Sequence, residues 1–322
     1  MSDRLDRLRA GAVLAAVGTF AALLMATPSA SAAGVAAAVP CVRPENRTTP
    51  TWRSVSEPEV TQADLDALPA SETTPRSRTA RSSAAALPTT VVIPVYMHVI
   101  SGRHRGERPK MGKYKARRLV TILNGGMDGS QSGASGSLRY RFTLKRVSYT
   151  KREGWYHAYF FGMRDKKAKK ALHRGNARAL NLYINGGGPK GQPVLGWSRF
   201  PWQYAADPRL DGVSVNVAGL PGGRATGYNL GDTVIHETGH WLGLLHTFQS
   251  GCEAGGDLVG DTPAEGEPSF YCETSRDTSP EDAGTDPVHN FMDYSLDSCM
   301  NMFTVGQVAR ADVAWAKWRQ RG

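Results

Sequence analysis

The sequence predicts an α+β fold with a mixed, twisted sheet and helices, then a histidine-rich helix, then an irregular part that ends in a helix. Three observations support this order. Apolar runs typical of strands alternate with helical periods between residues 91 and 231, regular periodicity fades after residue 246, and a helical period returns at Thr304. About 230 residues follow position 90, which is ample for one core with a cleft across it.

The first part of this region supplies the sheet. Val91 to Ile100 is an apolar run typical of a buried strand, and Lys113 to Leu123 is typical of a helix. Apolar side chains alternate from Leu138 to Tyr149, which predicts a strand with one buried face. A second helix is expected at residues 164–173, followed by strands at 179–184 and 212–217.

The last helix has a start signal of its own. Thr304-Val305-Gly306-Gln307 fits a capping box, in which the threonine and glutamine side chains each accept a hydrogen bond from the other residue's backbone N–H. Apolar residues then recur on one helical face, at Val308, Ala311, Trp315 and Trp318. We therefore expect a capped amphipathic helix here.

Between the two parts the chain reads His-Glu-Thr-Gly-His-Trp-Leu-Gly-Leu-Leu-His, from His236 to His246. Residues four apart lie on one face of a helix, so His236 and His240 can bind the same metal ion. A third ligand at position 244 would continue that face, but the chain holds Leu244 there. Gly243 explains why the third histidine comes later, at position 246. A glycine can end the helix in the left-handed conformation and turn His246 back toward the ion.

Three histidine ligands leave the fourth position of a zinc ion open for water, as in catalytic sites and not in structural ones. Glu237 follows the first ligand directly and is the expected general base, which holds a water molecule and accepts its proton. The alternative is a helix with hydrogen-bonded core histidines, but such a helix requires neither Glu237 nor Gly243. The motif therefore predicts a hydrolase with one catalytic zinc ion.

A second segment indicates the kind of hydrolase. His289-Asn290-Phe291-Met292-Asp293-Tyr294 lies downstream, at a distance suited to the methionine turn of the metzincins. Together with other matching segments, it makes residues 91 to 320 resemble the pappalysin family of metzincin zinc metalloproteases, in its secreted microbial branch. Those segments are Leu195-Gly196-Trp197, Phe200-Pro201-Trp202, Asp211-Gly212-Val213, Leu220-Pro221-Gly222-Gly223, Asp261-Thr262-Pro263, Asp286-Pro287-Val288-His289-Asn290 and Phe303-Thr304.

The resemblance implies a metzincin catalytic domain at residues 91–322, with an upper subdomain at 91–243 and a lower one at 244–322. It implies a secreted zinc endopeptidase that hydrolyses proteins or peptides. Met292 would form the hydrophobic floor under the zinc, and Tyr294 would donate a hydrogen bond to the negative oxygen of the transition state. Some relatives use an acid near the methionine turn to favour a basic residue just after the cleaved bond, and Asp297 is the nearest candidate.

The N-terminus predicts export. Arg4, Arg7 and Arg9 precede a 16-residue apolar stretch at 11–26, and the small residues Ala30-Ser31-Ala32 follow it. Residues 1–32 are thus expected to be a cleaved signal peptide, and the mature protein to be extracellular. A membrane anchor is the weaker alternative, because a spanning helix needs about 20 apolar residues. After cleavage we expect no membrane contact.

Residues 33–90 are rich in Ala, Ser, Thr and Pro and show no sustained period, which predicts a propeptide or a flexible leader. A propeptide is favoured because a secreted protease must be kept inactive before export. Cys41 is the candidate for that role, since its thiolate could occupy the open zinc position of such a zymogen. The alternative is a disulfide from Cys41 to the catalytic domain.

The four cysteines all follow the signal, in a compartment where disulfides persist. No Cys-x-x-Cys spacing occurs, which disfavours a four-cysteine zinc site. The family resemblance implies a disulfide between Cys272 and Cys299. In the family a second bridge commonly joins the region of Cys252 to a cysteine where this chain has Ser279. Cys252 is therefore expected to be either free or joined to Cys41.

Charge is divided unevenly. Residues 91–230 hold 25 Lys and Arg against 6 Asp and Glu, a balance of +19, whereas 231–322 hold 5 against 15, a balance of −10. Clustered carboxylates in the acidic part suit calcium, and solvated acidic loops are the alternative. The candidate calcium ligands are Glu253, Asp257, Asp261, Glu265 and Glu267.

The basic part contains a run that could contact anionic polymers, made of Lys166, Lys167, Lys169 and Lys170. No aromatic residues interleave with these lysines, so a solvated helix face is favoured and no specific nucleic acid is expected as a partner. This surface supports the alternative function, a secreted zinc-containing binding protein with a basic face. The intact Glu237 and the open zinc position favour the endopeptidase.

Overall fold

A computed structural model describes residues 89–132, 135–188, 194–252 and 256–320. The segment predicted as a signal peptide, almost all of the predicted leader, Cys41 and Glu253 lie outside the described residues. None of the described helices is both long and apolar enough to cross a membrane.

The sheet has five strands in the order β2-β1-β3-β5-β4. The first four, which are β1 (Val91–Ser101), β2 (Tyr140–Lys151), β3 (Leu180–Asn185) and β5 (Val213–Asn216), pair in parallel and match the predicted strands. β4 (Gly196–Ser198) runs antiparallel to β5 at the edge of the sheet, which makes the sheet mixed. Sequence periodicity did not predict β4, because three residues are too short to show an alternation.

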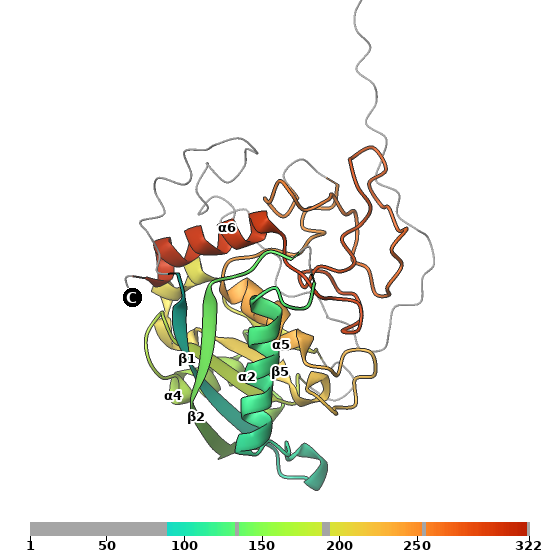
Figure 1. The fold of residues 1–322 in the computed structure, drawn as a ribbon. Coiled ribbons are helices and arrows are strands. Elements are labelled where there is room, and N and C mark those ends of the chain that lie inside the picture. The colour runs from blue at the N-terminus through green and yellow to red at the C-terminus, as the bar shows by residue number, and fades with distance from the viewer. Residues whose placement is uncertain (1–88, 133–134, 189–193, 253–255, 321–322) are drawn as a thin grey trace, which may run out of the picture. The chain divides into compact units, whose positions relative to one another are not determined.

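Two helices cover one face of the sheet. α2 (Lys113–Met127) and α5 (Asp232–Trp241) pack against each other, and both contribute to the main core (Figure 1). A Cβ atom at Gly126 of α2 would lie 2.4 Å from Ile235 Cδ1, so the glycine permits the close approach of α5. On the other face, Ile100 of β1 packs with the short α3 (Glu153–Tyr156) and with α4 (Met163–Leu172).

Between residues 244 and 303 the described residues contain no helix or strand. Phe291, Met292 and Phe303 nevertheless belong to the same core as the sheet. α6 (Val305–Ala314) follows, and its capping box has the predicted form, with Gln307 N–H donating to Thr304 Oγ1 at 3.1 Å and Thr304 N–H donating to Gln307 Oε1 at 2.9 Å. A π-helical turn continues it at Trp315–Arg319.

That last turn is anchored in the core through Arg319, which is fully buried. Its guanidinium donates to both carboxylate oxygens of Asp211, at 3.1 and 3.2 Å, and its Nε donates to the carbonyl of Trp241 at 2.9 Å. Trp241 in turn donates its indole N–H to Asp211 at 2.9 Å. This buried ion pair ties the C-terminal segment to the end of α5.

The basic run on α4 divides differently from the prediction. Lys166, Lys167 and Lys170 are exposed, but Lys169 is buried with 1 % of its surface accessible. Its ammonium lies 3.5 Å from Asp165, one helical turn earlier. The prediction of a solvated face was therefore wrong for Lys169, because an ion pair within the helix stabilises its charge in the core.

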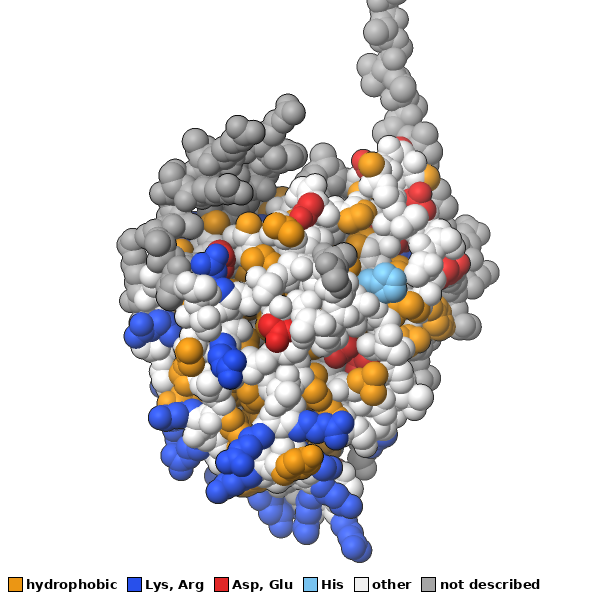
Figure 2. Space-filling view, viewed as in Figure 1, with side chains coloured by type: hydrophobic (Ala, Val, Ile, Leu, Met, Phe, Trp, Pro, Cys, Tyr) orange, Lys and Arg blue, Asp and Glu red, His pale blue; other side chains and the backbone are white. Residues whose placement is uncertain are grey.

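The charge division is visible on the surface. In the face shown in Figure 2, lysines and arginines gather on the sheet-and-helix part, and acidic side chains are scattered toward the loops.

Candidate active site

The predicted metal-binding segment forms α5 and the turn after it. α5 ends at Trp241, and Gly243 follows with φ +100°, the left-handed conformation that a glycine adopts without strain. The Leu244 N–H closes the turn by donating to the carbonyl of Gly239 at 3.0 Å. The chain therefore reverses where the sequence predicts, and His246 returns toward the helix.

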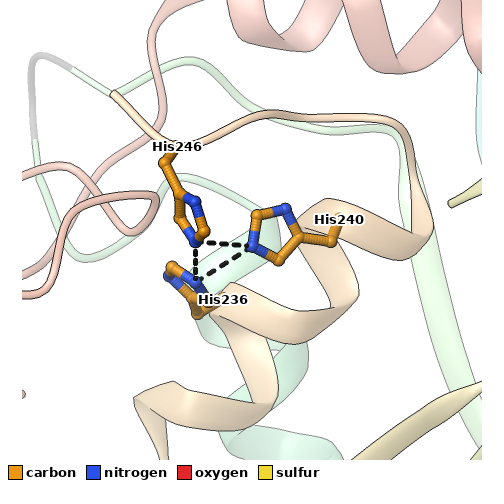
Figure 3. A group of neighbouring side chains, drawn as sticks. All are labelled: His236, His240 and His246. Atoms are coloured by element: carbon orange, nitrogen blue, oxygen red, sulfur yellow. Dashed lines mark hydrogen bonds between the residues drawn. The ribbon is translucent and has the colours of Figure 1, made fainter. Parts of the chain in front are cut away.

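The three imidazoles converge through their Nε2 atoms (Figure 3). The Nε2 of His236 lies 3.1 Å from that of His240 and 3.2 Å from that of His246, and the Nε2 atoms of His240 and His246 are 3.1 Å apart. The three atoms form a triangle. Three ligands of a tetrahedral zinc, each about 2.0–2.1 Å from the ion, are separated by about 3.3–3.4 Å. The triangle thus fits a metal ion of that size.

The other ring nitrogens hold the two helical imidazoles in place. His236 Nδ1 lies 2.7 Å from the carbonyl oxygen of Phe291, and His240 Nδ1 lies 2.7 Å from that of Leu244. A carbonyl can only accept, so both Nδ1 atoms carry the proton and both Nε2 atoms keep a lone pair. The protein therefore presets the tautomer that a metal ion needs.

Glu237 is buried beside the imidazoles, with 2 % of its surface accessible. Its side chain lies against Gly196 of the edge strand β4, where a Cβ atom would come within 2.3 Å of Glu237 Oε1. The side chain of any other residue at position 196 would displace the carboxylate. Gly196 belongs to one of the sequence segments that resemble the family, but only the structure shows that this glycine makes room for Glu237.

The methionine turn lies under α5. Met292 is fully buried, and a Cβ atom at Gly239 of the helix would come within 2.4 Å of its sulfur, so the helix approaches the turn closely. Asn290 holds the turn by accepting from the Met292 N–H at 2.9 Å. Its side-chain amide also pairs with that of Gln307, at 2.9 and 3.1 Å. The capping residue of α6 therefore also supports the floor of the site.

Tyr294 faces the three Nε2 atoms. Its hydroxyl lies 3.2 Å from His246 Nε2, and its ring packs edge-on against His246 and Phe248. Phe248 stacks on the His246 ring with centroids 4.7 Å apart. These aromatic contacts orient the one ligand that lies outside the helix.

A pocket opens beside Glu237 and extends toward the start of α5. Its wall contains Thr233, Tyr228 and Phe270, and Asp297 lines it as well. Asp297 Oδ2 accepts from the backbone N–H groups of residues 230, 231 and 232, at 2.7, 3.1 and 3.4 Å. Its Oδ1 is buried and has no hydrogen-bond partner among the described residues. Burial raises the pKa of Asp297 to about 6, although the three N–H groups favour the anion.

Comparison with known proteins identifies the family. The model of the peptidase family described as pregnancy-associated plasma protein-A matches residues 162–315. An extracellular metalloprotease of Pyricularia oryzae is 36% identical over 244 residues, which cover 74% of this chain and 80% of the relative. An extracellular metalloprotease of Neurospora crassa is 38% identical over 233 residues, which cover 71% of this chain and 76% of the relative.

The chain belongs to the pappalysin family. Mature mirolysin of Tannerella forsythia, solved with a cleaved peptide, is similar in structure with a TM-score of 0.58 and 26% identity, over 69% of this chain and 90% of that one. A promirolysin mutant from the same organism shares the fold, with a TM-score of 0.61 and 24% identity over 75% of this chain and 86% of that one. This pappalysin is therefore a metalloendopeptidase that acts outside the cell on proteins or peptides, and the binding-protein alternative is not favoured.

In this pappalysin the acidic residues predicted to bind calcium do not all converge. Glu265 and Glu267 each lie 3.2 Å from the guanidinium of Arg276, and the same guanidinium binds Asp286. Arg276 itself is buried. Arg276 therefore lies where the sequence analysis expected a calcium ion beside Glu265 and Glu267. Periodicity and composition do not show that this arginine packs between the two glutamates.

Asp257 and Asp261 contact other groups. Asp261 Oδ2 caps α6 by accepting from the Gly306 N–H at 2.8 Å. Asp257 is buried, and its Oδ1 accepts from the Val259 N–H at 3.0 Å, whereas its Oδ2 makes no hydrogen bond of normal geometry with the described residues. Burial raises the pKa of Asp257 to about 7.

Cys272 and Cys299 form a disulfide, the pairing that the family resemblance implies. The bridge joins the loop after the active-site helix to the segment behind the methionine turn, where His289 Nδ1 donates to the Cys299 carbonyl at 2.8 Å. Cys252 is disulfide-bonded as well, so the alternative that leaves it free is wrong.

Proposed function

We propose that this pappalysin binds one zinc ion through His236, His240 and His246 and uses Glu237 as the general base of peptide hydrolysis. The observation that carries the proposal is the triangle of three Nε2 atoms with edges of 3.1–3.2 Å beside a buried carboxylate. A zinc ion bound there would act as a Lewis acid, lowering the pKa of water and polarising the substrate carbonyl.

The side chains then have separate roles. Glu237 orients the attacking water, accepts its proton and passes that proton to the leaving amine. The Tyr294 hydroxyl donates to the oxygen on which negative charge develops. Met292 and Gly239 keep α5 seated on the methionine turn, so that His236 and His240 stay in place.

Metal removal tests this assignment directly. Treatment of the purified, processed protein with a chelator is expected to abolish casein cleavage, because the three imidazoles alone do not activate water. Addition of zinc is expected to restore cleavage. A chelated protein that keeps its full rate, or one that calcium alone restores, would contradict the proposal.

We also propose that Asp297 selects a basic residue immediately after the cleaved bond, the residue that becomes the new N-terminus. Asp297 lines the pocket beside Glu237, and a Lys or Arg side chain of the substrate would supply a partner for its Oδ1, which has none among the described residues. Three backbone N–H groups hold the other oxygen, so the carboxylate is preorganised for this contact.

We propose that calcium binds the lower subdomain at Asp257, whose Oδ2 is buried without a normal hydrogen bond. A hard cation would stabilise the anion that burial disfavours. Calcium is then expected to raise the Tm of the processed protein, and Asp257→Asn to remove that rise. Asp277→Asn on the surface serves as the matched control. An equal rise in Tm in all three proteins would contradict the assignment to Asp257.

We propose a signal peptide at 1–32, a propeptide or leader at 33–90 and the catalytic domain at 91–322. Cys41 has two alternative roles: its thiolate could occupy the fourth zinc position and keep the enzyme inactive, or it could form a disulfide. The disulfide is favoured, because Cys252 is disulfide-bonded.

A further inference from the structure

A second group of metal-binding side chains lies away from the catalytic triangle. It consists of His104 and Glu107, in the short helix at Arg105–Glu107 and just before it, and of Glu153 and His157, in α3 and directly after it. A ligand atom from each of His104, Glu107 and Glu153 lies within 4.8 Å of the others. None of these residues takes part in the proposed peptidase mechanism.

Two pairs of donor atoms are already spaced like neighbouring ligands. His157 Nε2 lies 3.1 Å from Glu107 Oε1 and 3.3 Å from Glu153 Oε1. These distances match the separation of about 3.3–3.4 Å between neighbouring ligands of a tetrahedral zinc. One imidazole nitrogen thus faces two carboxylate oxygens, although its ring offers a single proton or a single lone pair at that position.

The backbone orients both carboxylates toward this point. The Arg103 N–H donates to Glu153 Oε2 at 2.5 Å, and the His104 N–H donates to Glu107 Oε2 at 3.2 Å. In each carboxylate one oxygen is held by the loop and the other is turned to His157. Ligating carboxylates in metal sites are commonly fixed in this way by outer hydrogen bonds.

We propose that His104, Glu107, Glu153 and His157 form a second divalent metal site, of the kind that takes zinc. Two imidazoles and two carboxylates are a donor set that suits zinc and disfavours calcium, which prefers oxygen ligands only. Glu107 is 8 % exposed and anchors the site, whereas His104 is exposed and can turn its ring onto the ion. The ion would join the loop after β1 to α3.

The stoichiometry of zinc tests the proposal. The full processed protein is stripped with a chelator, dialysed against dilute zinc chloride and then analysed for zinc per chain. We expect two zinc ions per chain. The variant with Glu153→Gln and His157→Gln, at two partly exposed side chains, is expected to bind one zinc and to keep the wild-type rate of peptide cleavage. A matched double variant with His173→Gln and Glu281→Gln is expected to keep two.

A complementary variant separates this site from the catalytic one. With His240→Ala and His246→Ala the protein is expected to lose cleavage but to keep one zinc, and zinc is expected to raise its Tm. Adding Glu153→Gln and His157→Gln to that chain should remove both the zinc and the Tm rise. One zinc per wild-type chain, or two in the Glu153→Gln and His157→Gln variant, would overturn the second site without affecting the peptidase proposal.

Discussion

Replacing Glu237 by Gln is expected to lower kcat for peptide cleavage by about 10³-fold while the zinc content of the protein stays that of the wild type. The amide has nearly the same shape as the carboxylate, so it fits against Gly196 as Glu237 does. It cannot accept a proton from water at neutral pH. The three imidazoles do not depend on Glu237 for their tautomers, because the carbonyls of Phe291 and Leu244 set them.

The measurement is kcat with a quenched fluorescent peptide, together with zinc content. Glu281→Gln, an exposed change of the same chemistry, is the control and should leave both values unchanged. A Glu237→Gln enzyme with the wild-type rate would remove Glu237 from the mechanism. A large loss of rate accompanied by loss of zinc would instead assign Glu237 to metal binding.

The second large effect concerns specificity. Asp297→Asn is expected to lower kcat/KM by about 10²-fold for a peptide with Arg after the cleaved bond, because a partly buried charge pair loses one partner. A matched peptide with Leu at that position should be cleaved at nearly the wild-type rate. Since the two peptides share every other contact, the ratio of their kcat/KM values isolates the pocket. A wild-type preference for large apolar residues would refute the assignment.

The same preference should depend on pH. Burial raises the pKa of Asp297 to about 6, so its carboxylate is charged above that pH and neutral below it. The ratio of kcat/KM for the Arg peptide over the Leu peptide is therefore expected to be high at neutral pH and to fall as the pH drops through about 6. Any other effect of pH on catalysis applies to both peptides and cancels in the ratio. A constant ratio between pH 5 and 8 would contradict an ionised Asp297 as the selecting group.

Much of the fold follows from local pattern. The four parallel strands and the helices α2, α4 and α6 lie within a few residues of their predicted bounds, because each is long enough to show a period of two or of 3.6 residues. The edge strand β4 was not predicted, because it spans only three residues. Its Gly196 nevertheless borders Glu237, the proposed general base, so a short element that periodicity misses shapes the site.

Charged residues were predicted less well than apolar ones. Lys169 was placed in a solvated run, and it lies buried beside Asp165. Glu265 and Glu267 were expected to attract calcium, and they bind Arg276 instead. In each case the partner determines the environment of the charge. For the two glutamates that partner lies about ten residues away along an irregular loop, where no helical or strand period sets the spacing.

By itself the sequence determined the chemistry of this protein, because helix geometry brings His236 and His240 to one face, and Gly243 permits the reversal that returns His246. Only the tertiary structure decided how that chemistry is held in place. The Phe291 carbonyl that sets the His236 tautomer, the glycine that makes room for Glu237 and the Arg103 N–H that orients Glu153 all come from distant parts of the chain. Such contacts depend on how the elements pack, and packing leaves no periodic trace in the sequence.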